Sequence, residues 1–502
     1  MRVTRLKVAN LRVIEAADFR FQPGFNLIVG VNGVGKTSVL DALAVCLSGI
    51  VKHTNRLRTR AESLLTNDIR VGAQALTAAC GIQLGDAEYE YLIHKSRESS
   101  EAQAQRSGMP REQVIDTPDK AEFVGTAPKP AATKQPGGRP IGILFSTRRA
   151  APTERAKSKS AAAGGIAAAF ADAFADRELR LVEFAAWMRA QKSLATEKGE
   201  LIHVLNAFES AASRFLPGYS NIRPTDEVQP KLLIDHGEKV TVRVDKLSDT
   251  ERAQLKEALG WAENWMALNW EPARDMAEAH LREAYAGKRA ATLVEGLARF
   301  LPNCEHLRAD PNEPDSQLID RKPTTIEVRH LSDGERGTLA MVLDLTRRLA
   351  QANPTMIDPA AEAEAVVLID EIDLHLHPKW QRQIVQNLTA AFPKCQFIAT
   401  THSPQVIGEV EPKRIQIIAG GQVYSPTHSF GVDSSRVLEE IMEATPRTEE
   451  VQDLLSRLSR AIGVGNYRLA HELLAELTVQ LGENDPEVTR TRTLLEFMEG
   501  EK

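Results

Sequence analysis

A glycine-rich segment, GVNGVGKT at residues 30–37, has the composition and spacing of a phosphate-binding loop. It follows the apolar run NLIV (26–29) and opens a helix-like segment, so backbone N–H groups at a helix N-terminus would face the phosphates of a nucleotide. Lys36 would reach the β- and γ-phosphates, and the Thr37 hydroxyl would ligate Mg²⁺. A chance glycine-rich turn is the alternative, and its flanking segments disfavour it. The residues predicted to bind ATP here are Asn32, Gly33, Val34, Gly35, Lys36, Thr37 and Ser38.

A second motif, AVVLIDEIDLHLHP at residues 365–378, ends an apolar strand-like run with two adjacent carboxylates. Asp370 is placed to hold the Mg²⁺ shell together with Thr37. Because adjacent strand residues point to opposite sides, Glu371 can serve a different task. We predict that Glu371 is the base that polarises the attacking water. Asp373 lies just beyond, where it could sense a partner subunit.

Histidines occur at two places near these carboxylates. His402 follows another apolar run in FIATTHSPQVI (397–407), where it could hydrogen-bond the γ-phosphate or the attacking water. A capping or merely exposed histidine is the alternative, and the two preceding motifs disfavour it. His375 and His377 alternate along the chain as metal ligands can, but a third ligand is missing nearby, so we do not expect a metal site there.

A further polar motif, LSDGERG at residues 331–337, begins another helix-like segment. The Ser332 hydroxyl and a glycine-flanked helix N-terminus form a second anion site, at which Gly334 leaves room for backbone amides to approach a γ-phosphate. Glu335 belongs to the same motif. Lys36 lies 296 residues earlier, and the P-loop already holds the phosphates of its own subunit from one side. The second site is therefore expected to face the nucleotide of a partner subunit.

This motif has a near-copy, KLSDTERA, at residues 246–253. Other matches share its register: RFLP at 214–217 and 299–302, and LID at 233–235 and 318–320, each offset by 85, whereas LSD is offset by 84. Several matches in one register indicate an internal repeat, with copies at 214–253 and 299–337. Thr250 stands where the second copy has Gly334, and its branched Cβ would obstruct a phosphate. The first copy is therefore expected to be a degenerate structural element.

The order of strand-like and helix-like segments indicates an α/β fold interrupted by a lobe. Strands are expected at 26–29, 141–145, 365–370 and 396–400, and helical periodicity occurs at 177–213 and 250–298. The expected domains are a head (1–95 and 326–430, with a strand in 141–150), a flexible insertion (96–138), an inserted lobe (151–325) and a helical C-terminal region (431–502). The C-terminal helices could cap the core or dock a partner, and Asn484-Asp485-Pro486 predicts a turn between two of them.

Composition restricts the classes of protein further. The net charge of −6 excludes a global basic field; Arg56, Arg58 and Arg60 form a local basic cluster, for which a solvated loop is the simpler interpretation. The four cysteines are scattered, as expected for free thiols in a reducing cytosol. No run of about 18 apolar residues could span a bilayer. We therefore expect a cytoplasmic protein that does not enter membranes.

Taken in order, these motifs resemble the head of an ABC-type ATPase. The residues that carry the resemblance are Gly30–Thr37, Ser332–Gly337, Asp370, Glu371, Asp373 and His402. The resemblance implies that two heads sandwich two nucleotides, with Ser332 and Gly334 acting in trans. Within the superfamily, DEIDLHLHP, THSP and RHLSDGERG resemble the SMC/RecF/OLD-like ATPases of prokaryotes. ILFSTRRA (143–150) and GVDSSRVLEEIMEATPR (431–447) are similar to toprim-less members, in outline the PtuA-like ATPases of Septu and retron anti-phage systems.

The resemblance also carries expectations about partners. The 100 residues after His402 contain no DxD pair of a toprim nuclease, and no HNH-like histidine cluster occurs, so we expect no nuclease centre in this chain. The resemblance implies a separate partner, because PtuA-like proteins work with an HNH nuclease, PtuB. The expected function is therefore a slow, regulatory ATPase that dimerises head to head, controls such a nuclease, and meets DNA directly or through that partner.

Other interpretations remain open. The distance between Lys36 and Ser332 disfavours a transporter ATPase, and the insertion is too short and too broken for the coiled coils of Rad50 or SMC proteins. A RecF-like repair ATPase that binds DNA directly is the main alternative, and an ATP-binding scaffold with negligible turnover is a third. We predict that Gly334→Thr abolishes ATP-dependent pairing of heads and that Thr250→Gly leaves it unchanged.

Overall fold

A six-stranded sheet forms the centre of the computed structural model. The structure describes residues 1–57, 61–97, 119–128, 138–150, 152, 166–198, 202–215, 218–227, 229–237, 240–243, 304–309, 317–321, 323–442 and 447–500. The sheet has the order β17-β16-β3-β15-β14-β7. Its strands are β3 (Phe25–Val29), β7 (Ile141–Phe145), β14 (Ala365–Ile369), β15 (Gln396–Thr400), β16 (Ile415–Ala419) and β17 (Gln422–Tyr424).

All neighbouring strands of this sheet are parallel except the β16–β17 pair. Every residue of β3, β7, β14 and β15 is buried, as expected for a parallel sheet that is covered on both faces. The strands predicted from the four apolar runs are therefore confirmed to within one residue at each end. The α/β class is confirmed as well.

A second, antiparallel sheet has the order β2-β1-β4-β5-β6. Its strands are β1 (Arg2–Leu11), β2 (Ile14–Arg20), β4 (Ala75–Leu84), β5 (Ala87–Ser96) and β6 (Lys120–Phe123). Helix α1 (Lys36–Thr54), which follows the glycine-rich loop, contacts strands of both sheets. Strand β6 lies inside the segment 96–138, where we expected a flexible insertion. The ring of Phe123 meets those of Tyr91 and His53, each at 5.1 Å, and this aromatic packing fixes β6 at the edge of the sheet.

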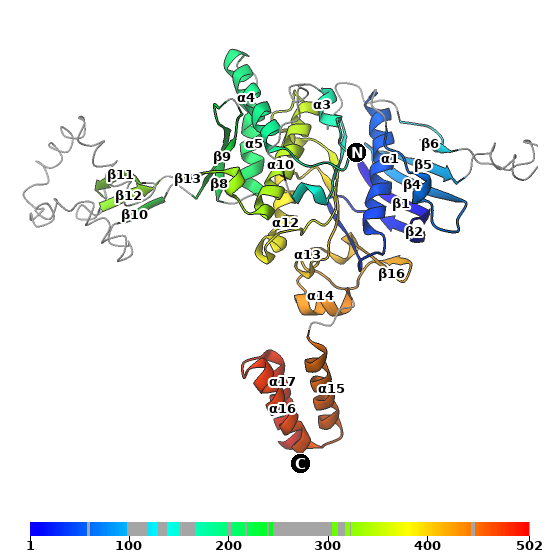
Figure 1. The fold of residues 1–502 in the computed structure, drawn as a ribbon, viewed down its shortest axis with the longest axis vertical. Helices are drawn as coiled ribbons and strands as arrows, with labels where there is room; N and C mark the ends of the chain where they lie inside the picture. Colours follow the sequence, from blue (N-terminus) through cyan, green and yellow to red (C-terminus); the bar gives the residue numbers. More distant parts are fainter. Residues whose placement is uncertain are drawn as a thin grey trace, which may run out of the picture.

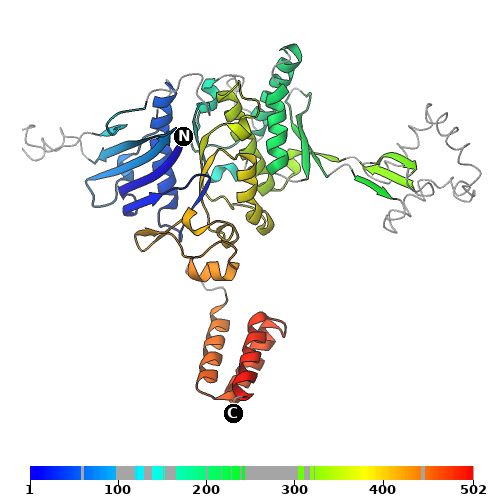
Figure 2. The same cartoon turned by 180° about the vertical axis from the view of Figure 1, so that it is seen from behind.

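Helices on the far side of the parallel sheet from α1 complete the head (Figures 1 and 2). They are α3 (Ile166–Phe170), α4 (Leu181–Lys198), α5 (Ile202–Phe215), α10 (Asp333–Ala352), α11 (Pro359–Glu362) and α12 (Pro378–Ala391). Below them lie α13 (Pro404–Ile407) and α14 (Ser434–Glu440). Helix α10 is buried along most of its length and contacts α3, α5 and β7. In the described part of the chain, 3₁₀ turns at Thr66–Asp68, Thr147–Ala150, Val328–His330 and Pro412–Arg414 join these elements.

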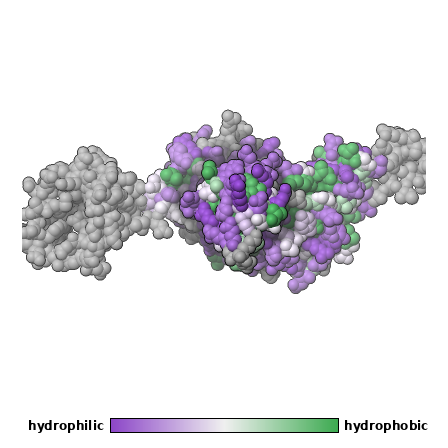
Figure 3. Space-filling view, turned by 90° about the horizontal axis from the view of Figure 1, so that it is seen from below, coloured by the Kyte–Doolittle hydropathy of each residue, from purple (hydrophilic) through white to green (hydrophobic). Residues whose placement is uncertain are grey.

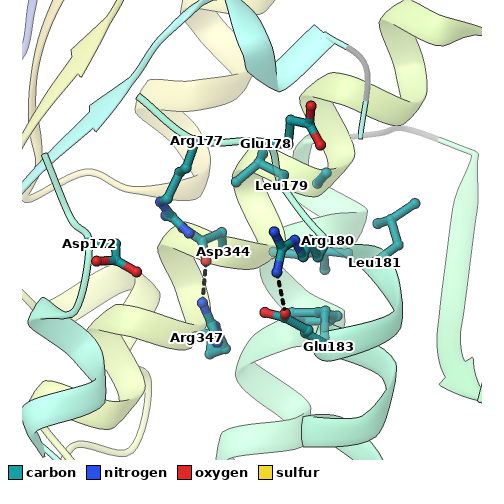
Figure 4. Close-up of a pocket in the computed structure, with 12 residues that line it drawn as sticks. Asp172, Arg177, Glu178, Leu179, Arg180, Leu181, Glu183, Asp344 and Arg347 are labelled. Carbon is teal, nitrogen blue, oxygen red and sulfur yellow. Dashed lines mark hydrogen bonds and ion pairs between the residues drawn. The ribbon is translucent and has the colours of Figure 1, made fainter. Parts of the chain in front are cut away.

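A buried ionic cluster anchors α10 to the chain that precedes α4. Asp344 accepts hydrogen bonds from Arg177, Arg347 and Arg348, and Arg348 also donates to the carbonyls of Ala169 and Ala171 at 2.7 and 2.9 Å. Burial would raise the pKa of Asp344, but the three guanidinium groups outweigh it and hold that pKa well below the ordinary value. Figure 4 shows the adjoining pocket of about 150 Å³, which Arg177 and Arg347 line beside Asp344.

The internal repeat corresponds to two sets of three strands. The first copy contains β8 (Tyr219–Pro224), β9 (Leu232–His236) and β10 (Val240–Arg243), and the second contains β11 (Cys304–Ala309), β12 (Gln317–Arg321) and β13 (Thr324–Glu327). The first two strands of each set begin 85 residues apart and the third 84 apart. The residue lost between the copies therefore belongs to the part of the sequence between the second and third strands, 237–239 in one copy and 322–323 in the other.

The two copies exchange their third strands. The sheets have the orders β13-β9-β8 and β10-β12-β11. Thr324 lies opposite His236 in the first sheet, and Val240 lies opposite Arg321 at the equivalent positions of the second. The first sheet is built from β8, β9 and β13, and the segment between β9 and β13 contributes β10, β11 and β12. These three strands form the same arrangement with the third strand first in the chain, so the inserted copy is circularly permuted. The first-copy motif 246–253, with Thr250, lies outside the described residues.

Cross-linking should distinguish the exchanged third strands from an arrangement in which each copy pairs its second strand with its own third strand. Leu233 lies opposite Glu327, whose first-copy equivalent is Arg243. Directly opposed residues bring their Cβ atoms to about 4.5–5.5 Å. A short thiol cross-linker is therefore expected to join the cysteines of the Leu233→Cys/Glu327→Cys variant and to fail with Leu233→Cys/Arg243→Cys. Mass spectrometry of the linked peptides identifies the product, and preferential linkage to position 243 would contradict the exchange.

The C-terminal region forms a separate hydrophobic core from α15 (Glu449–Gly463), α16 (Tyr467–Leu481) and α17 (Pro486–Gly500). The predicted turn at Asn484-Asp485-Pro486 is confirmed, because α17 begins at Pro486. The surface seen from this end of the molecule is mainly hydrophilic, with smaller hydrophobic areas (Figure 3). Within the described part of the chain, every helix is too short or too polar to cross a membrane.

Candidate active site

The predicted site residues meet at the carboxyl edge of the parallel sheet. The glycine-rich loop follows β3, Asp370 follows β14, and Thr401 and His402 follow β15. These three strands are neighbours and run in the same direction, so the segments that leave them emerge side by side. The topology alone therefore brings together residues that are separated by more than 300 positions in the sequence.

The glycine-rich loop has the conformation that its glycines permit. Gly33 and Gly35 have φ values of 83° and 103°, a region that other residues rarely adopt. A Cβ at Gly30 would lie 2.7 Å from the carbonyl oxygen of Ile418, so the loop also needs glycine there for space. Asn32, Gly33 and Thr37 are exposed. The loop can therefore offer its amides and the Thr37 hydroxyl to a ligand from solvent.

Lys36 is the first residue of α1, and its ammonium group is buried against the loop. Its Nζ donates to the carbonyls of Gly30 and Val31 at 2.8 and 3.0 Å. Burial lowers the pKa of Lys36, whereas the carboxylates of Asp370, Glu371 and Asp373 act in the opposite direction. These contacts hold the ammonium on the side of the loop that faces the acidic residues, as expected of a phosphate-binding lysine.

Thr37 and Asp370 are placed to share a cation. Thr37 Oγ1 lies 3.2 Å from Asp370 Oδ2 and donates a hydrogen bond to it. Thr400 Oγ1 donates to Asp370 Oδ1 at 2.6 Å and so fixes the carboxylate from its other side. A hydroxyl and a carboxylate are hard oxygen ligands of the kind that Mg²⁺ uses beside nucleotide phosphates. The pair fits the predicted role of Thr37 and Asp370.

Two threonines that sequence reasoning missed hold the backbone of Glu371 and the carboxylate of Asp373. Thr400 Oγ1 accepts a hydrogen bond from the Glu371 N–H at 2.7 Å, and Thr401 Oγ1 donates to Asp373. Glu371 itself has a φ of 46°, unusual for a residue with a Cβ. The two apolar strands could have indicated these contacts. Because β14 and β15 pair in parallel, the residues after β15 lie opposite those after β14.

His402 faces the same group of charges. Burial and the positive charge of Lys36 lower its pKa below the ordinary value, against the opposing effects of Asp373, Glu371 and Asp370. The neutral imidazole is therefore favoured at neutral pH and can both donate and accept a hydrogen bond. Because its pKa is lower in the folded than in the unfolded chain, His402 reduces folding stability as the pH falls below about 6.5.

The Lys36→Met substitution is expected to raise the pKa of His402, because it removes the cation that opposes the imidazolium. NMR titration of ¹³C-labelled histidines measures this pKa directly. Lys379→Met is the matched control, since this lysine lies on α12 and has no part in the shift. An equal midpoint in Lys36→Met and the unsubstituted protein would show that the two side chains do not interact.

The predicted second anion site lies at the N-terminus of α10. Ser332 caps the helix, because its Oγ accepts from the Glu335 N–H at 3.4 Å. In return, Glu335 Oε2 accepts from the Ser332 N–H at 3.1 Å and from the Ser332 hydroxyl at 2.6 Å. Tyr219, from β8, donates its hydroxyl to Glu335 Oε1 at 3.2 Å. Burial and Glu335 raise the pKa of Tyr219 to about 12, so this donor keeps its proton at neutral pH. These bonds connect Ser332 and Glu335 to each other and to Tyr219.

Gly334 has a further role that the sequence did not reveal. A Cβ added there would overlap the carbonyl oxygen of His375 and lie 3.0 Å from its carbonyl carbon. His375 has a φ of 60° in the tight turn that follows Glu371. The glycine is thus required for packing within one chain, in addition to the phosphate approach that we predicted.

Other residues considered as ligands have different neighbours. Among the described residues, no group of three or more histidine, cysteine, aspartate or glutamate side chains could hold a metal ion. His377 caps α12, with its Nδ1 accepting from the Lys379 N–H at 3.3 Å.

Two families of known proteins match this chain. One, described as "AAA domain", matches residues 5–127, and another, described as "AAA domain, putative AbiEii toxin, Type IV TA system", matches residues 243–408. The first match includes the glycine-rich loop, and the second includes Ser332, Asp370, Glu371 and His402. Both halves of the candidate site therefore belong to segments that are typical of ATPases.

Curated relatives include ATPases of two kinds of system. The chain is 25% identical to the "Retron Ec83 probable ATPase" of Escherichia coli, a match that covers 99% of this chain and 87% of the relative. It is 34% identical to the "Retron Vc95 probable ATPase" of Vibrio cholerae over 36% of each chain. It is 45% identical to the Septu protein PtuA of Bacillus mycoides over 16% of this chain and 10% of the relative.

Among solved structures, the chain is similar to an Smc head bound to the C-winged helix domain of ScpA, with 13% identity and a TM-score of 0.40. It is also similar to the recombination mediator RecF with ATPγS, with 16% identity and a TM-score of 0.38. These matches cover 85% and 84% of this chain and 98% of each structure. The fold is identified by the sheet topology and the sequence matches. This chain has an α/β head with a glycine-rich loop, two of its segments match AAA-domain families, and it is related to the retron ATPases and to the Septu protein PtuA.

Proposed function

We propose that this ATPase binds ATP·Mg²⁺, associates head to head, and uses its nucleotide state to control a separate HNH nuclease of the PtuB type in anti-phage defence. The observation that carries the catalytic part is the convergence of Lys36, Thr37, Asp370, Glu371 and His402 at one edge of one sheet. Its relatives among retron and Septu proteins support the defence role.

Each side chain at this edge has a distinct task in the proposal. The loop amides and Lys36 hold the phosphates, and Thr37 with Asp370 would hold Mg²⁺, which supplies charge neutralisation at the phosphates when it is bound. Glu371 orients the attacking water and accepts its proton. His402, neutral near pH 7, hydrogen-bonds the γ-phosphate or this water. Asp373, hydrogen-bonded to Thr401, senses the partner subunit.

The head-to-head arrangement gives the second anion site a task. Ser332, Gly334 and Glu335 would contact the nucleotide of the partner subunit, and the capping contacts at α10 support a preformed site. We propose that turnover is slow and regulatory, and that the chain acts in the prokaryotic cytoplasm without a nuclease centre of its own. The C-terminal helices α15–α17, with their separate core, are the proposed surface for docking the nuclease.

Two measurements on the full chain test this proposal. Analytical ultracentrifugation should show dimers with ATPγS and Mg²⁺ and monomers without nucleotide, and Ser332→Ala should weaken the dimer while it leaves ATP binding intact. Co-purification with an HNH protein encoded beside this chain tests the partner. Nucleotide binding without phosphate release would instead favour an ATP-binding scaffold, and an absence of ATPγS-dependent association would contradict the head-to-head arrangement.

A RecF-like ATPase that binds DNA directly is the second candidate, and one groove favours it. Lys52, His53 and Arg56 line a groove of about 770 Å³ at the end of α1, together with the rings of Tyr91 and Phe123. Basic and aromatic side chains in one groove suit a nucleic-acid strand. Tight binding of duplex DNA by the isolated chain, lost in Lys52→Glu/Arg56→Glu, would support this candidate. Binding only in the presence of an HNH partner would support the first.

A further inference from the structure

A buried arginine outside the recognised motifs contacts the acidic motif directly. Arg149 lies in the 3₁₀ turn Thr147–Ala150, which follows β7, and its side chain is only 4% exposed. Its guanidinium donates to the backbone carbonyls of Asp370 and of Glu371, the latter at 2.6 Å, and to that of Ser146 at 2.9 Å. One guanidinium group thus binds the backbone carbonyls of two adjacent candidate site residues, Asp370 and Glu371.

These hydrogen bonds hold a backbone segment that has an unusual conformation at Glu371. Glu371, with its φ of 46°, has the left-handed conformation that costs a residue with a Cβ roughly 1–2 kcal/mol. Thr400 Oγ1 accepts the hydrogen bond of the Glu371 N–H at 2.7 Å, and Arg149 holds the Glu371 carbonyl. Both peptide groups of Glu371 are therefore fixed, one by Thr400 of β15 and the other by Arg149 in the turn after β7. An unusual conformation persists when its surroundings determine it in this way.

The charge of Arg149 is also placed among carboxylates. Burial lowers its pKa to about 10, against the opposing effects of Asp370, Asp373 and Glu371. The guanidinium is thus still charged at neutral pH and partly balances three acidic groups. Arg148, its neighbour, points elsewhere: it is largely exposed and pairs with Asp176 at 2.8 Å. Arg149 therefore contacts the acidic motif, whereas the adjacent Arg148 pairs with Asp176.

We propose that Arg149 is a positioning residue for ATP hydrolysis, which fixes the carbonyls of Asp370 and Glu371 so that the Glu371 carboxylate keeps the direction that it needs as a base. This proposal rests on the proposed role of Glu371. Lysine at this position would retain the positive charge but could not bridge two carbonyls with a planar fork. The geometry of the fork, beyond its charge, is therefore what the site requires.

The test compares Arg149→Lys with Arg148→Lys in the full chain. Arg149→Lys is expected to lower kcat about 10–100-fold, because small misplacements of catalytic groups have effects of this size. KM for ATP should change little while the protein stays folded at the assay temperature, and Arg148→Lys should resemble the unsubstituted protein. If Arg149 only supported the fold, the affinity for ATP would fall together with kcat, and the proposal would be overturned.

A double substitution sharpens the result. If Arg149 acts through Glu371, Arg149→Lys should have no further effect on kcat in a Glu371→Gln background, whereas independent effects would multiply. Multiplying effects would overturn the proposal.

A measurement without turnover separates this proposal from the proposed function. Mn²⁺ affinity in the presence of ATPγS, followed by EPR, should fall several-fold in Arg149→Lys and stay constant in Arg148→Lys, because Asp370 is held by the same fork. Absence of phosphate release by the unsubstituted protein would refute the proposed ATP hydrolysis, and the Mn²⁺ result would still decide the case of Arg149. Equal Mn²⁺ affinities in the two variants would overturn its positioning role.

Discussion

Glu371→Gln should reduce kcat for ATP hydrolysis by about 10²–10⁴-fold while it preserves ATP binding. A removed general base typically has an effect of this size, and the amide keeps the shape of the side chain but cannot accept the proton. Lys36 and Thr37, which we propose hold the nucleotide, contact other atoms and remain in place. ATP should therefore accumulate in the bound state, and heads that pair in the presence of ATP should stay paired.

Phosphate release and nucleotide affinity measure the two parts of this prediction separately. Glu364→Gln is the matched control, because Glu364 immediately precedes the same strand, β14, at its amino end. Its kcat should equal that of the unsubstituted protein. Retention of most of the activity in Glu371→Gln would assign the base to another residue, and His402→Gln would then be the variant to compare.

Gly334→Ala should destabilise the chain and abolish ATP-dependent pairing of heads. The added methyl group would overlap the carbonyl oxygen of His375, a backbone atom that cannot move without disturbing the turn after Glu371. Overpacking of this kind costs about 1–3 kcal/mol of unfolding free energy. The effect of Gly334→Thr should be larger, as the bulkier branched side chain meets the same carbonyl and also Leu376.

Thermal unfolding without nucleotide tests the new explanation. Gly463→Ala is the matched control, since Gly463 is also helical and a Cβ there meets nothing within 4 Å. If Gly334 served only the approach of a phosphate, Gly334→Ala would leave the unfolding of the nucleotide-free chain unchanged and would affect only pairing. A lower unfolding temperature together with a loss of head pairing in Gly334→Ala would support the contact with His375.

The local sequence was sufficient to predict the parts of the site that local chemistry determines. The conformation of the glycine-rich loop follows from its glycines, and the placement of Asp370 and His402 follows from the apolar strands that precede them. The capping of α10 is similarly local, because Ser332 and Glu335 are three residues apart. Each of these features depends on a few adjacent residues and on hydrophobic periodicity.

Contacts between distant segments could not be predicted in the same way. Thr400 and Arg149 act on Glu371 through a strand order that the sequence does not state, and STRRA offers two arginines without indicating which one is buried. Gly334 looked like a phosphate contact because its own motif explained it, and only the packed turn at His375 reveals the second constraint. At 120–123, the edge strand β6 lies in a segment whose composition indicated no structure.

The exchanged third strands have a consequence for the order in which the protein is made. Strand β10 leaves the ribosome directly after β9, and β13 follows 84 residues later. At 5–20 residues per second, that interval is on the order of 4–17 s, far longer than the microseconds in which a hairpin forms. During this time we expect β9 to pair with β10, which is equivalent to β13 in the repeat, and this hairpin must open before β13 can pair with β9. Synthesis rate and chaperone supply should therefore control the yield of active protein more strongly than its final stability does.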